Sequence, residues 1–267
     1  MPYLNGEPLA AALRDRAAFP HVELVTAVPS ELLAGLLRGQ LDAALVSVAG
    51  VLAEPELRIL PGYGVTARGA VQSIQLYARV PLAEVRSVAL DASSRSGTAL
   101  TRLLFAARYR ARPEFFCRPP DLEQMLAEAD AVLLIGDPCL RASTRLDAGD
   151  WSGPVPTRVD LGAEWERWIG LPFVYAVWAA PAHGDLPRLA ALFERAAHWG
   201  LPRAADLARA GAAATGLSED AAVAYLTNVI RYPLAEPEMA GLRRFCDLCR
   251  QHGVLPPDAA ARLAPAG

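Results

Sequence analysis

The chain has 267 residues, of which 53% are hydrophobic and 21% are charged, and its formal net charge is −3 at pH 7. This length can bury a substantial core, in one large domain or in two of ordinary size, and the charge gives no basic footprint for nucleic acid or an acidic membrane. No basic segment followed by an apolar run opens the chain, and the uncharged apolar stretch 171–183 is too short to span a bilayer, so we expect a cytoplasmic protein.

Strand and helix signals alternate through the first 82 residues. Helices are expected at 8–17 and 32–38, and strands at 1–4, 21–27, 42–48, 57–61 and 73–80. The run DAALVSV at 42–48 is continuously apolar, which suits a strand buried in a parallel sheet. Residues 81–86 then form an expected linker to a second unit.

The second unit continues the alternation. Strands are expected at 87–90, 114–117, 131–135 and 171–180, and helices after Ser96, at 121–129 and at 160–170. From Asp185 onward the pattern is helical throughout. Such alternation predicts parallel α/β sheets that bind ligands at the carboxyl ends of their strands. Small polar residues occupy the expected strand ends: Asn5, Ser47, Ser73, residues 91–96 and Gly136-Asp137.

One of these strand ends has the composition of an anion site. Residues 91–104 read DASSRSGTALTRLL, and the apolar residues from Leu100 onward recur at helical spacing. The first N–H groups of a helix lack internal partners and carry partial positive charge. Three serines and Arg95 at a helix start therefore favour a carboxylate or phosphate site over a simple helix cap, which one serine would provide.

A Cys-x-x-Cys near the C-terminus invites a metal or redox interpretation. Cys246 and Cys249 are followed by His252, but Leu242 and Phe245 share a helix face with both cysteines. A redox pair normally opens a helix after a strand, and a zinc site needs further ligands. Cysteine is also a common core residue. We therefore expect core packing here, with no metal and no disulfide.

Five short segments share an order and spacing that is specific when they occur together. They are YLN followed by Pro8-Leu9 (3–9), PSELLAGLLRGQLDAALVS (29–47), VQSIQLYARVPLAEVRSVALDASSRS (71–96), LLIGD (133–137) and DLGAEWERWIGLPFVYAVWAA (160–180). In this combination the chain closely resembles the chorismate dehydratase family of the futalosine route to menaquinone. The likeness covers nearly the whole chain, including Tyr225, Ile230 and Tyr232 in the tail.

The resemblance implies an α/β fold like that of the type II periplasmic binding proteins, with two lobes, a ligand cleft between them and a helical C-terminal region. The first lobe would comprise residues 1–82 and 178–267, and the second residues 83–177. The implied reaction is the loss of water from chorismate to give 3-[(1-carboxyvinyl)oxy]benzoate, without a cofactor. Only Met1 and Pro2 precede the YLN motif, fewer residues than the family would have, so either the first strand is short or the given start lies late, and the pairing of that strand stays open.

Site residues follow from the resemblance position by position. Asn5 and Ser73 match the family's candidates for catalytic contacts. Substrate binding would involve Ser47, Ser94, Arg95, Ser96, Thr98, Gly136 and Asp137, with the SSR turn at 94–96 holding a carboxylate. Gly97 and Thr98 depart from the family pattern, so hydroxyl contacts there are expected to shift by one position. Taken alone, Asn5 is as readily a turn residue, Ser73 a partner for a backbone group and Asp137 a cap.

The chemistry asked of these residues is modest, because loss of water from chorismate makes an aromatic ring. Positioned polar groups can steer that elimination without a metal. None of the four histidines lies at a motif strand end, so our hypothesis is that the substrate's own enolpyruvyl carboxylate removes the ring proton, with Asp137 as the alternative base.

Two other functions, and the formation of a homodimer, stay open at this point. The sibling enzyme 1,4-dihydroxy-6-naphthoate synthase relies on a histidine in its second lobe, and residues 85–180 contain none. A non-catalytic small-carboxylate-binding protein would share the fold. A homodimer through the alanine- and leucine-rich helices of 186–217 is conceivable, although burial within one chain explains their composition equally well.

Overall fold

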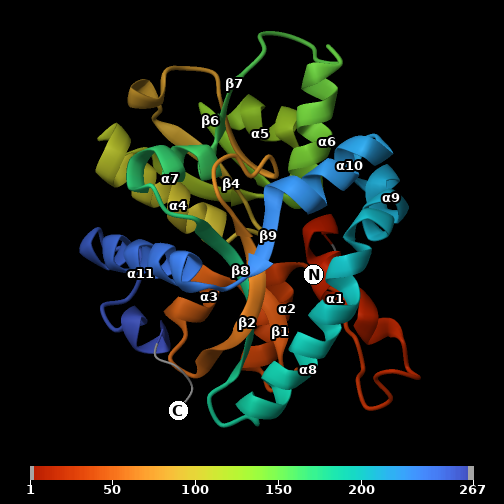
Figure 1. The fold of residues 1–267 in the computed structure, drawn as a ribbon. Coiled ribbons are helices and arrows are strands. Elements are labelled where there is room, and N and C mark those ends of the chain that lie inside the picture. The colour runs from red at the N-terminus through yellow and green to blue at the C-terminus, as the bar shows by residue number, and fades with distance from the viewer. Residues whose placement is uncertain (1–2, 264–267) are drawn as a thin grey trace.

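The computed structural model describes residues 3–263 and contains two β-sheets (Figure 1). The first sheet has the strand order β1-β8-β2-β9, with the strands Ala44–Ser47 (β1), Phe173–Pro181 (β8), Leu57–Ala67 (β2) and Ile230–Pro233 (β9). The second sheet has the order β5-β4-β6-β3-β7, with Glu114–Arg118 (β5), Ser87–Asp91 (β4), Ala131–Ile135 (β6), Ile74–Ala78 (β3) and Thr157–Asp160 (β7). The chain therefore crosses between the sheets twice, after β2 and after β7.

Helices cover both sheets and connect their strands (Figure 1). They are Glu7–Ala10 (α1), Pro29–Leu37 (α2), Val48–Ala53 (α3), Ser96–Leu104 (α4), Leu122–Glu128 (α5), Gly136–Asp147 (α6), Leu161–Ile169 (α7), Leu186–Gly200 (α8), Ala204–Thr215 (α9), Glu219–Ala224 (α10) and Glu236–Gln251 (α11). Short 3₁₀ segments are Leu4–Gly6 (η1), Ala11–Arg14 (η2), Leu82–Glu84 (η3), Leu201–Arg203 (η5) and Ala259–Leu263 (η7). Two π-helical turns are Phe105–Tyr109 (η4) and Tyr225–Val229 (η6).

The central strands of the second sheet, β4, β6 and β3, are buried on both faces, which explains their apolar runs. Val88, Leu90 and Leu133 point into the main core, whereas Ala89 and Val132 point to a second core beneath α5 and α6. Successive side chains of a strand face opposite sides of a sheet. A strand covered on both sides must therefore be apolar at every position, as β6 is.

Strand direction differs from the parallel sheets that the alternation predicts. Only β4 runs parallel to its neighbours, β5 and β6, while β3 is antiparallel to β6 and β7. In the first sheet β8 is antiparallel to both β1 and β2, and β9 is antiparallel to β2. The prediction fails there because β8 returns from the other sheet and inserts between β1 and β2, which would otherwise be parallel neighbours.

Other local expectations also need correction. Residues 21–27 form no strand, and Leu4 begins a 3₁₀ turn rather than ending a strand, while Met1 and Pro2 lie outside the described residues. The helix expected at 8–17 is divided between α1 and η2. The tail is not helical throughout, because residues 230–233 form β9. Their burial alternates, and they pair with β2, a partner distant in sequence.

The division into lobes at residues 82/83 and 177/178 stays a prediction. Strand membership points to somewhat earlier crossovers, since β3 already belongs to the second sheet and Phe173 already belongs to the first. Residues 68–73 and 161–172 carry the chain between the sheets. These crossovers bring Ser73 and β8 to the boundary between the two halves.

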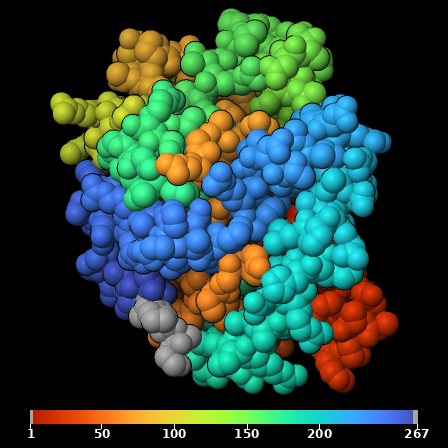
Figure 2. Space-filling model, viewed as in Figure 1, coloured from red at the N-terminus to blue at the C-terminus, as the bar shows by residue number. Residues whose placement is uncertain are grey.

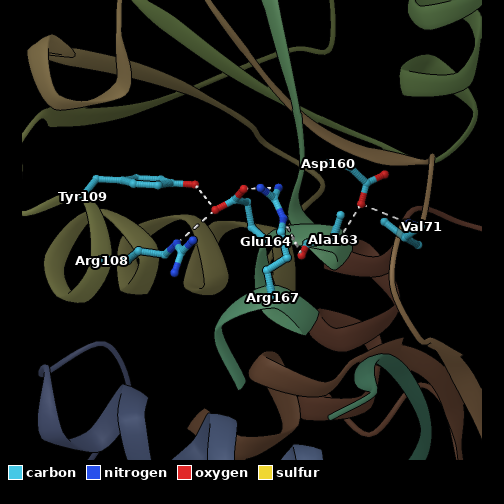
Figure 3. A network of polar contacts seen from close by, with 7 residues as sticks. All are labelled: Val71, Arg108, Tyr109, Asp160, Ala163, Glu164 and Arg167. Carbon is cyan, nitrogen blue, oxygen red and sulfur yellow. Dashed lines mark hydrogen bonds and ion pairs between the residues drawn. The ribbon is translucent and has the colours of Figure 1, made fainter. Parts of the chain in front are cut away.

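A carboxylate fixes the first crossover (Figure 3). Asp160 caps α7 by accepting a hydrogen bond from the backbone N–H of Ala163, and it also accepts from the backbone N–H groups of Val71 and Gln72, at 3.0 and 2.7 Å. Gln72 has a φ of 63°, which few non-glycine residues adopt. The contacts to Asp160 hold this left-handed turn and so set the position of Ser73.

The second crossover is tied to α4 by another buried carboxylate (Figure 3). Glu164 on α7 accepts hydrogen bonds from Arg108 Nε at 3.1 Å and Tyr109 Oη at 3.0 Å, and it also pairs with Arg167. Arg108 and Tyr109 belong to the π-helical turn that ends α4. This network joins α7 to the C-terminal end of α4. We call the turn that precedes α4, residues 93–96, the serine turn.

The C-terminal third spans both halves. In Figure 2 its residues form a band across the face in view, between the parts built from the two sheets. The helix α8 packs against α1 and β2, while α9 packs against both α1 and α6. Cys246 and Cys249 on α11 are fully buried in the main core. Within residues 3–263, none of the helices has the length and apolar character needed to cross a membrane.

Candidate active site

A pocket with about 440 Å³ of empty space lies between the two halves of the molecule. Its walls come from β1, β2 and β8 of the first sheet, from the ends of β3, β4 and β6 of the second, and from the N-terminal segment. Its polar lining residues are Tyr3, Asn5, Ser47, Ser93, Ser94, Arg95, Ser96 and Tyr175.

The turn between β4 and α4 offers groups that suit an anion. The buried Ser94 Oγ has no hydrogen-bond partner within residues 3–263, and the exposed Arg95 makes no ion pair within that range. Both line the pocket next to the N-terminus of α4, which begins at Ser96. A Cβ on Gly97 would lie 2.6 Å from Ser94 Oγ, so the glycine lets this hydroxyl lie against the helix start. A carboxylate placed here would meet a cation, a hydroxyl and helix N–H groups.

Ser96 links the two halves at the pocket floor. Its hydroxyl donates to the backbone oxygen of Tyr175 at 2.8 Å and accepts from the backbone N–H of Ala49 at 3.2 Å. Ser47 Oγ lies 2.7 Å from Ser96 Oγ and must donate to it, because the only proton of Ser96 is already used. We call this group the serine latch (Ser47, Ser96 and the Tyr175 carbonyl). Ser96 is thus satisfied by the protein itself, whereas Ser94 is not.

The ring of Tyr3 is held beside the turn by a second chain of hydroxyls. Ser93 donates to Asp91 Oδ1 at 2.6 Å, so Tyr3 Oη donates to Ser93 Oγ at 2.9 Å. Burial raises the pKa of Tyr3 to about 12, and burial likewise raises the pKa of Asp91. Gly136 has a φ of 60°, and a Cβ there would lie 2.8 Å from the Tyr3 ring. Only glycine allows the ring to pack this closely.

Asn5 and Ser73, the expected catalytic pair, are joined by a tyrosine from the C-terminal region. Asn5 Nδ2 donates to Tyr225 Oη at 3.3 Å, and Tyr225 Oη donates to Ser73 Oγ at 2.8 Å. Asn5 lines the pocket, and its Oδ1 has no partner within residues 3–263. Ser73 is fully buried and does not line the pocket. In this structure Asn5 alone of the pair faces the ligand space.

Two expected substrate-binding residues have structural partners instead. Asp137 Oδ1 accepts from the backbone N–H of Leu4 at 3.1 Å, and Thr98 Oγ1 donates to the backbone oxygen of Ser94 at 2.9 Å. Neither residue lines the pocket, although Gly136 does. Burial raises the pKa of Asp137 from 3.8 to about 6, against the lowering effects of the Leu4 N–H and Arg141. Asp137 holds the YLN segment against the start of α6.

The charge of the pocket is one-sided. Among the described residues, its lining includes Arg95 but no aspartate, glutamate or histidine. Hydroxyls and the asparagine supply the other polar groups. The pocket therefore attracts anions and offers no lining side chain of its own that is a strong base near neutral pH.

Comparisons with known proteins decide the family. Residues 1–251 match the sequence profile of the family described as menaquinone biosynthesis. The chain belongs to this menaquinone biosynthesis family. The chain is similar in sequence to the chorismate dehydratase of Thermus thermophilus. The two are 33% identical over 259 residues, which covers 92% of this chain and 94% of that protein.

Solved structures show the fold of this menaquinone biosynthesis family member. A protein of Archaeoglobus fulgidus superposes with a TM-score of 0.66 at 16% identity, covering 93% of this chain and 95% of that one. The alkanesulfonate-binding protein SsuA of Xanthomonas axonopodis, bound to MOPS, gives 0.63 at 16% identity, over 98% and 93%. A Candida albicans protein described as having the generic periplasmic binding protein fold gives 0.64 at 11% identity, over 98% and 92%. The expected two-sheet periplasmic-binding-protein-like α/β fold is confirmed.

Most of the polar residues that line the pocket were expected from the sequence, but its tyrosines were not. Asn5, Ser47, Ser94, Arg95, Ser96 and Gly136 all line the pocket as expected. Tyr3 and Tyr175 also line it, although the sequence indicated them only as members of the family motifs. Tyr225 had no assigned role, because a single tyrosine in an alanine-rich helical pattern carries no local sign of function.

Proposed function

We propose that this chain catalyses the elimination of water from chorismate, giving 3-[(1-carboxyvinyl)oxy]benzoate for menaquinone biosynthesis, and that it is therefore a hydro-lyase. The observation that carries the proposal is the likeness to the Thermus chorismate dehydratase along nearly the full length of both chains. The pocket supports it, because Arg95 and Ser94 suit one carboxylate of the substrate and Asn5 suits a polar group some distance away.

The positions of these groups suggest how the substrate lies. One carboxylate binds at the serine turn, against Arg95 and the N-terminus of α4. The ring hydroxyl lies near Asn5, which comes from the N-terminal segment, whereas Arg95 comes from the turn before α4. Such fixed polar contacts lower the barrier by holding the reacting groups in place.

The proton acceptor in this proposal is the substrate itself. With no aspartate, glutamate or histidine among the described lining residues, the enolpyruvyl carboxylate is the nearest available base. It removes the ring proton, the electrons of that C–H bond form the new ring double bond, and the C–O bond to the hydroxyl breaks. The resulting carboxylic acid returns the proton to the departing hydroxyl, which leaves as water. The protein contributes orientation and a complementary field.

The test is incubation of the purified full chain with chorismate, without added metal or nucleotide. Formation of a product lighter by one water, with the absorbance of an aromatic enol ether, supports the proposal. Tight binding of chorismate without conversion would instead indicate a non-catalytic carboxylate-binding protein; proteins that share this fold include sulfonate-binding proteins. Turnover of the substrate of 1,4-dihydroxy-6-naphthoate synthase, with chorismate untouched, would place the chain at the sibling reaction.

A cytoplasmic location, the lack of a cofactor and a homodimer stay predictions. The helices α8 and α9 already pack on α1, α6 and β2 of the same chain, so intramolecular burial accounts for part of their apolar surface. Light scattering of the purified protein measures the oligomeric state directly.

A further inference from the structure

Tyr225 lies where three segments distant in sequence meet behind the pocket wall. It comes from the π-helical turn η6, which directly precedes β9, and its side chain is 1% exposed. Its hydroxyl contacts Asn5 of the N-terminal segment and Ser73 of the first crossover. A π-turn within helical structure is rare and often marks a functional site. The reaction proposed above gives Tyr225 no role.

The hydrogen bonds of Tyr225 have a defined direction. A tyrosine hydroxyl carries one proton, and burial raises the pKa of Tyr225 above its usual range, so the proton stays in place. That proton is donated to Ser73 Oγ. The oxygen of Tyr225 can then only accept, and it accepts from Asn5 Nδ2. The amide nitrogen of Asn5 is thereby turned toward Tyr225.

The other end of the amide is left for a ligand. Asn5 Oδ1 is buried, has no partner within residues 3–263, and belongs to a side chain that lines the pocket. A buried acceptor without a partner is costly unless a ligand satisfies it. A carbonyl oxygen accepts hydrogen bonds and repels a carboxylate. Its natural partner is therefore a hydroxyl group of the bound molecule.

We propose that Tyr225 is a positioning residue that orients the Asn5 amide so that Oδ1 accepts a hydrogen bond from the hydroxyl group that the substrate loses. This inference rests on the proposed function and deepens it. With its hydrogen held by Asn5, the substrate hydroxyl keeps both oxygen lone pairs free. One of them receives, from the enolpyruvyl carboxylic acid, the proton taken from the ring carbon. Water then leaves with the electrons of the C–O bond, while the ring C–H bond supplies the electrons of the new double bond.

Ser73 has a defined place in this arrangement. It accepts the proton of Tyr225 and does not reach the pocket. Without Ser73 Oγ, the Tyr225 proton is free to turn toward Asn5 Oδ1, which would reverse the amide. Ser73 and Tyr225 therefore act on the substrate through the same group. Removing both hydroxyls is expected to cost no more than removing the more important one.

The experiment compares Tyr225→Phe, Ser73→Ala and the double variant with a matched control, Tyr232→Phe. Tyr232 is also a buried tyrosine of the C-terminal region, on β9, and its hydroxyl has no partner within residues 3–263. With chorismate as substrate, we expect kcat to fall about 10- to 100-fold in each single variant with little change in KM. The double variant should match the slower single variant, and Tyr232→Phe should match the unsubstituted chain.

Each outcome separates the two proposals. If the unsubstituted chain leaves chorismate unchanged, the proposed function fails and the role of Tyr225 falls with it. If that chain is active but Tyr225→Phe is as fast as Tyr232→Phe, only the role of Tyr225 is overturned. If the kcat losses of the two single variants multiply in the double variant, the role of Tyr225 is also overturned, because Ser73 would then act independently of Tyr225. Thermal unfolding is measured in parallel. If Tyr225→Phe proves unstable, Ser73→Ala gives the same test, because Ser73 contacts Tyr225 and does not line the pocket.

Discussion

Replacement of Asp137 by asparagine should stabilise the protein, and increasingly so as the pH rises. Asp137 is 8% exposed, and burial raises its pKa from 3.8 to about 6. This difference corresponds to about 3 kcal/mol of free energy. Asparagine keeps an oxygen that can accept from the Leu4 N–H, at 3.1 Å from Asp137 Oδ1, without the charge that burial penalises.

The sign follows from the two protonation equilibria of Asp137. Because the folded state holds the proton more tightly than the unfolded chain, the contribution of this carboxyl to stability is fully present below pH 3.8. It is lost as the pH rises through about 6, where the folded carboxyl ionises. The asparagine variant does not titrate there. Its advantage over the parent chain should be about 1.5 kcal/mol at pH 5 and about 3 kcal/mol at pH 8.

Urea unfolding of both proteins at pH 5 and pH 8 measures this difference, and steady-state turnover at each pH measures the effect on catalysis. We expect Asp137→Asn to retain turnover, because Asp137 does not line the pocket. An advantage that is absent at pH 8, or equal at both values, would refute the electrostatic reasoning. A folded variant whose turnover falls more than about 100-fold would show that Asp137 is the proton acceptor after all.

The remaining predictions concern the crossover, the anion site and the latch. Asp160→Ala should lower the free energy of unfolding by about 3 kcal/mol in urea titrations, because a cap and the crossover N–H groups lose their acceptor. Arg95→Ala should raise KM for chorismate about 10-fold or more, with Arg95→Lys intermediate and kcat less affected. Ser96→Ala should lower Tm and raise KM together, since it removes the contacts that join the two halves at the pocket; an unchanged Tm would argue against the latch.

The parts of the fold that could be predicted from the sequence are those set by local pattern. The run AVLLI at 131–135 is β6 to the residue, and the serine turn begins α4 at Ser96 as the helix signals indicate. Apolar strands covered on both faces and a hydroxyl-rich helix start depend on neighbouring residues only. Ser94 and Arg95 follow a strand and line the pocket as the pattern indicates, whereas Asn5, expected after a strand, lies in a 3₁₀ turn and still lines the pocket.

The parts that could not be predicted depend on partners far along the chain. The insertion of β8 between β1 and β2 reverses the expected sheet direction, and nothing in either segment encodes that neighbour. The strand β9 exists because β2 offers it an edge, in a tail whose composition is helical. Likewise, the motif predicts that Ser73 lies at the pocket. In the structure the Tyr225 hydroxyl lies between Ser73 and Asn5 and hydrogen-bonds to both.

The distribution of charge around the pocket connects a binding fold with an elimination reaction. Binding proteins of this architecture hold a ligand between two halves, and here the serine latch joins the two halves directly. The pocket then adds a cation and helix N–H groups at the turn before α4, and a fixed acceptor at Asn5. A lining carboxylate would repel a dianionic substrate and compete with the substrate's own carboxylate as base. Its absence among the described lining residues favours binding the dianion tightly and leaving the proton transfer to the substrate. On this reasoning, introducing a carboxylate beside Arg95 would weaken binding more than it would help the chemistry.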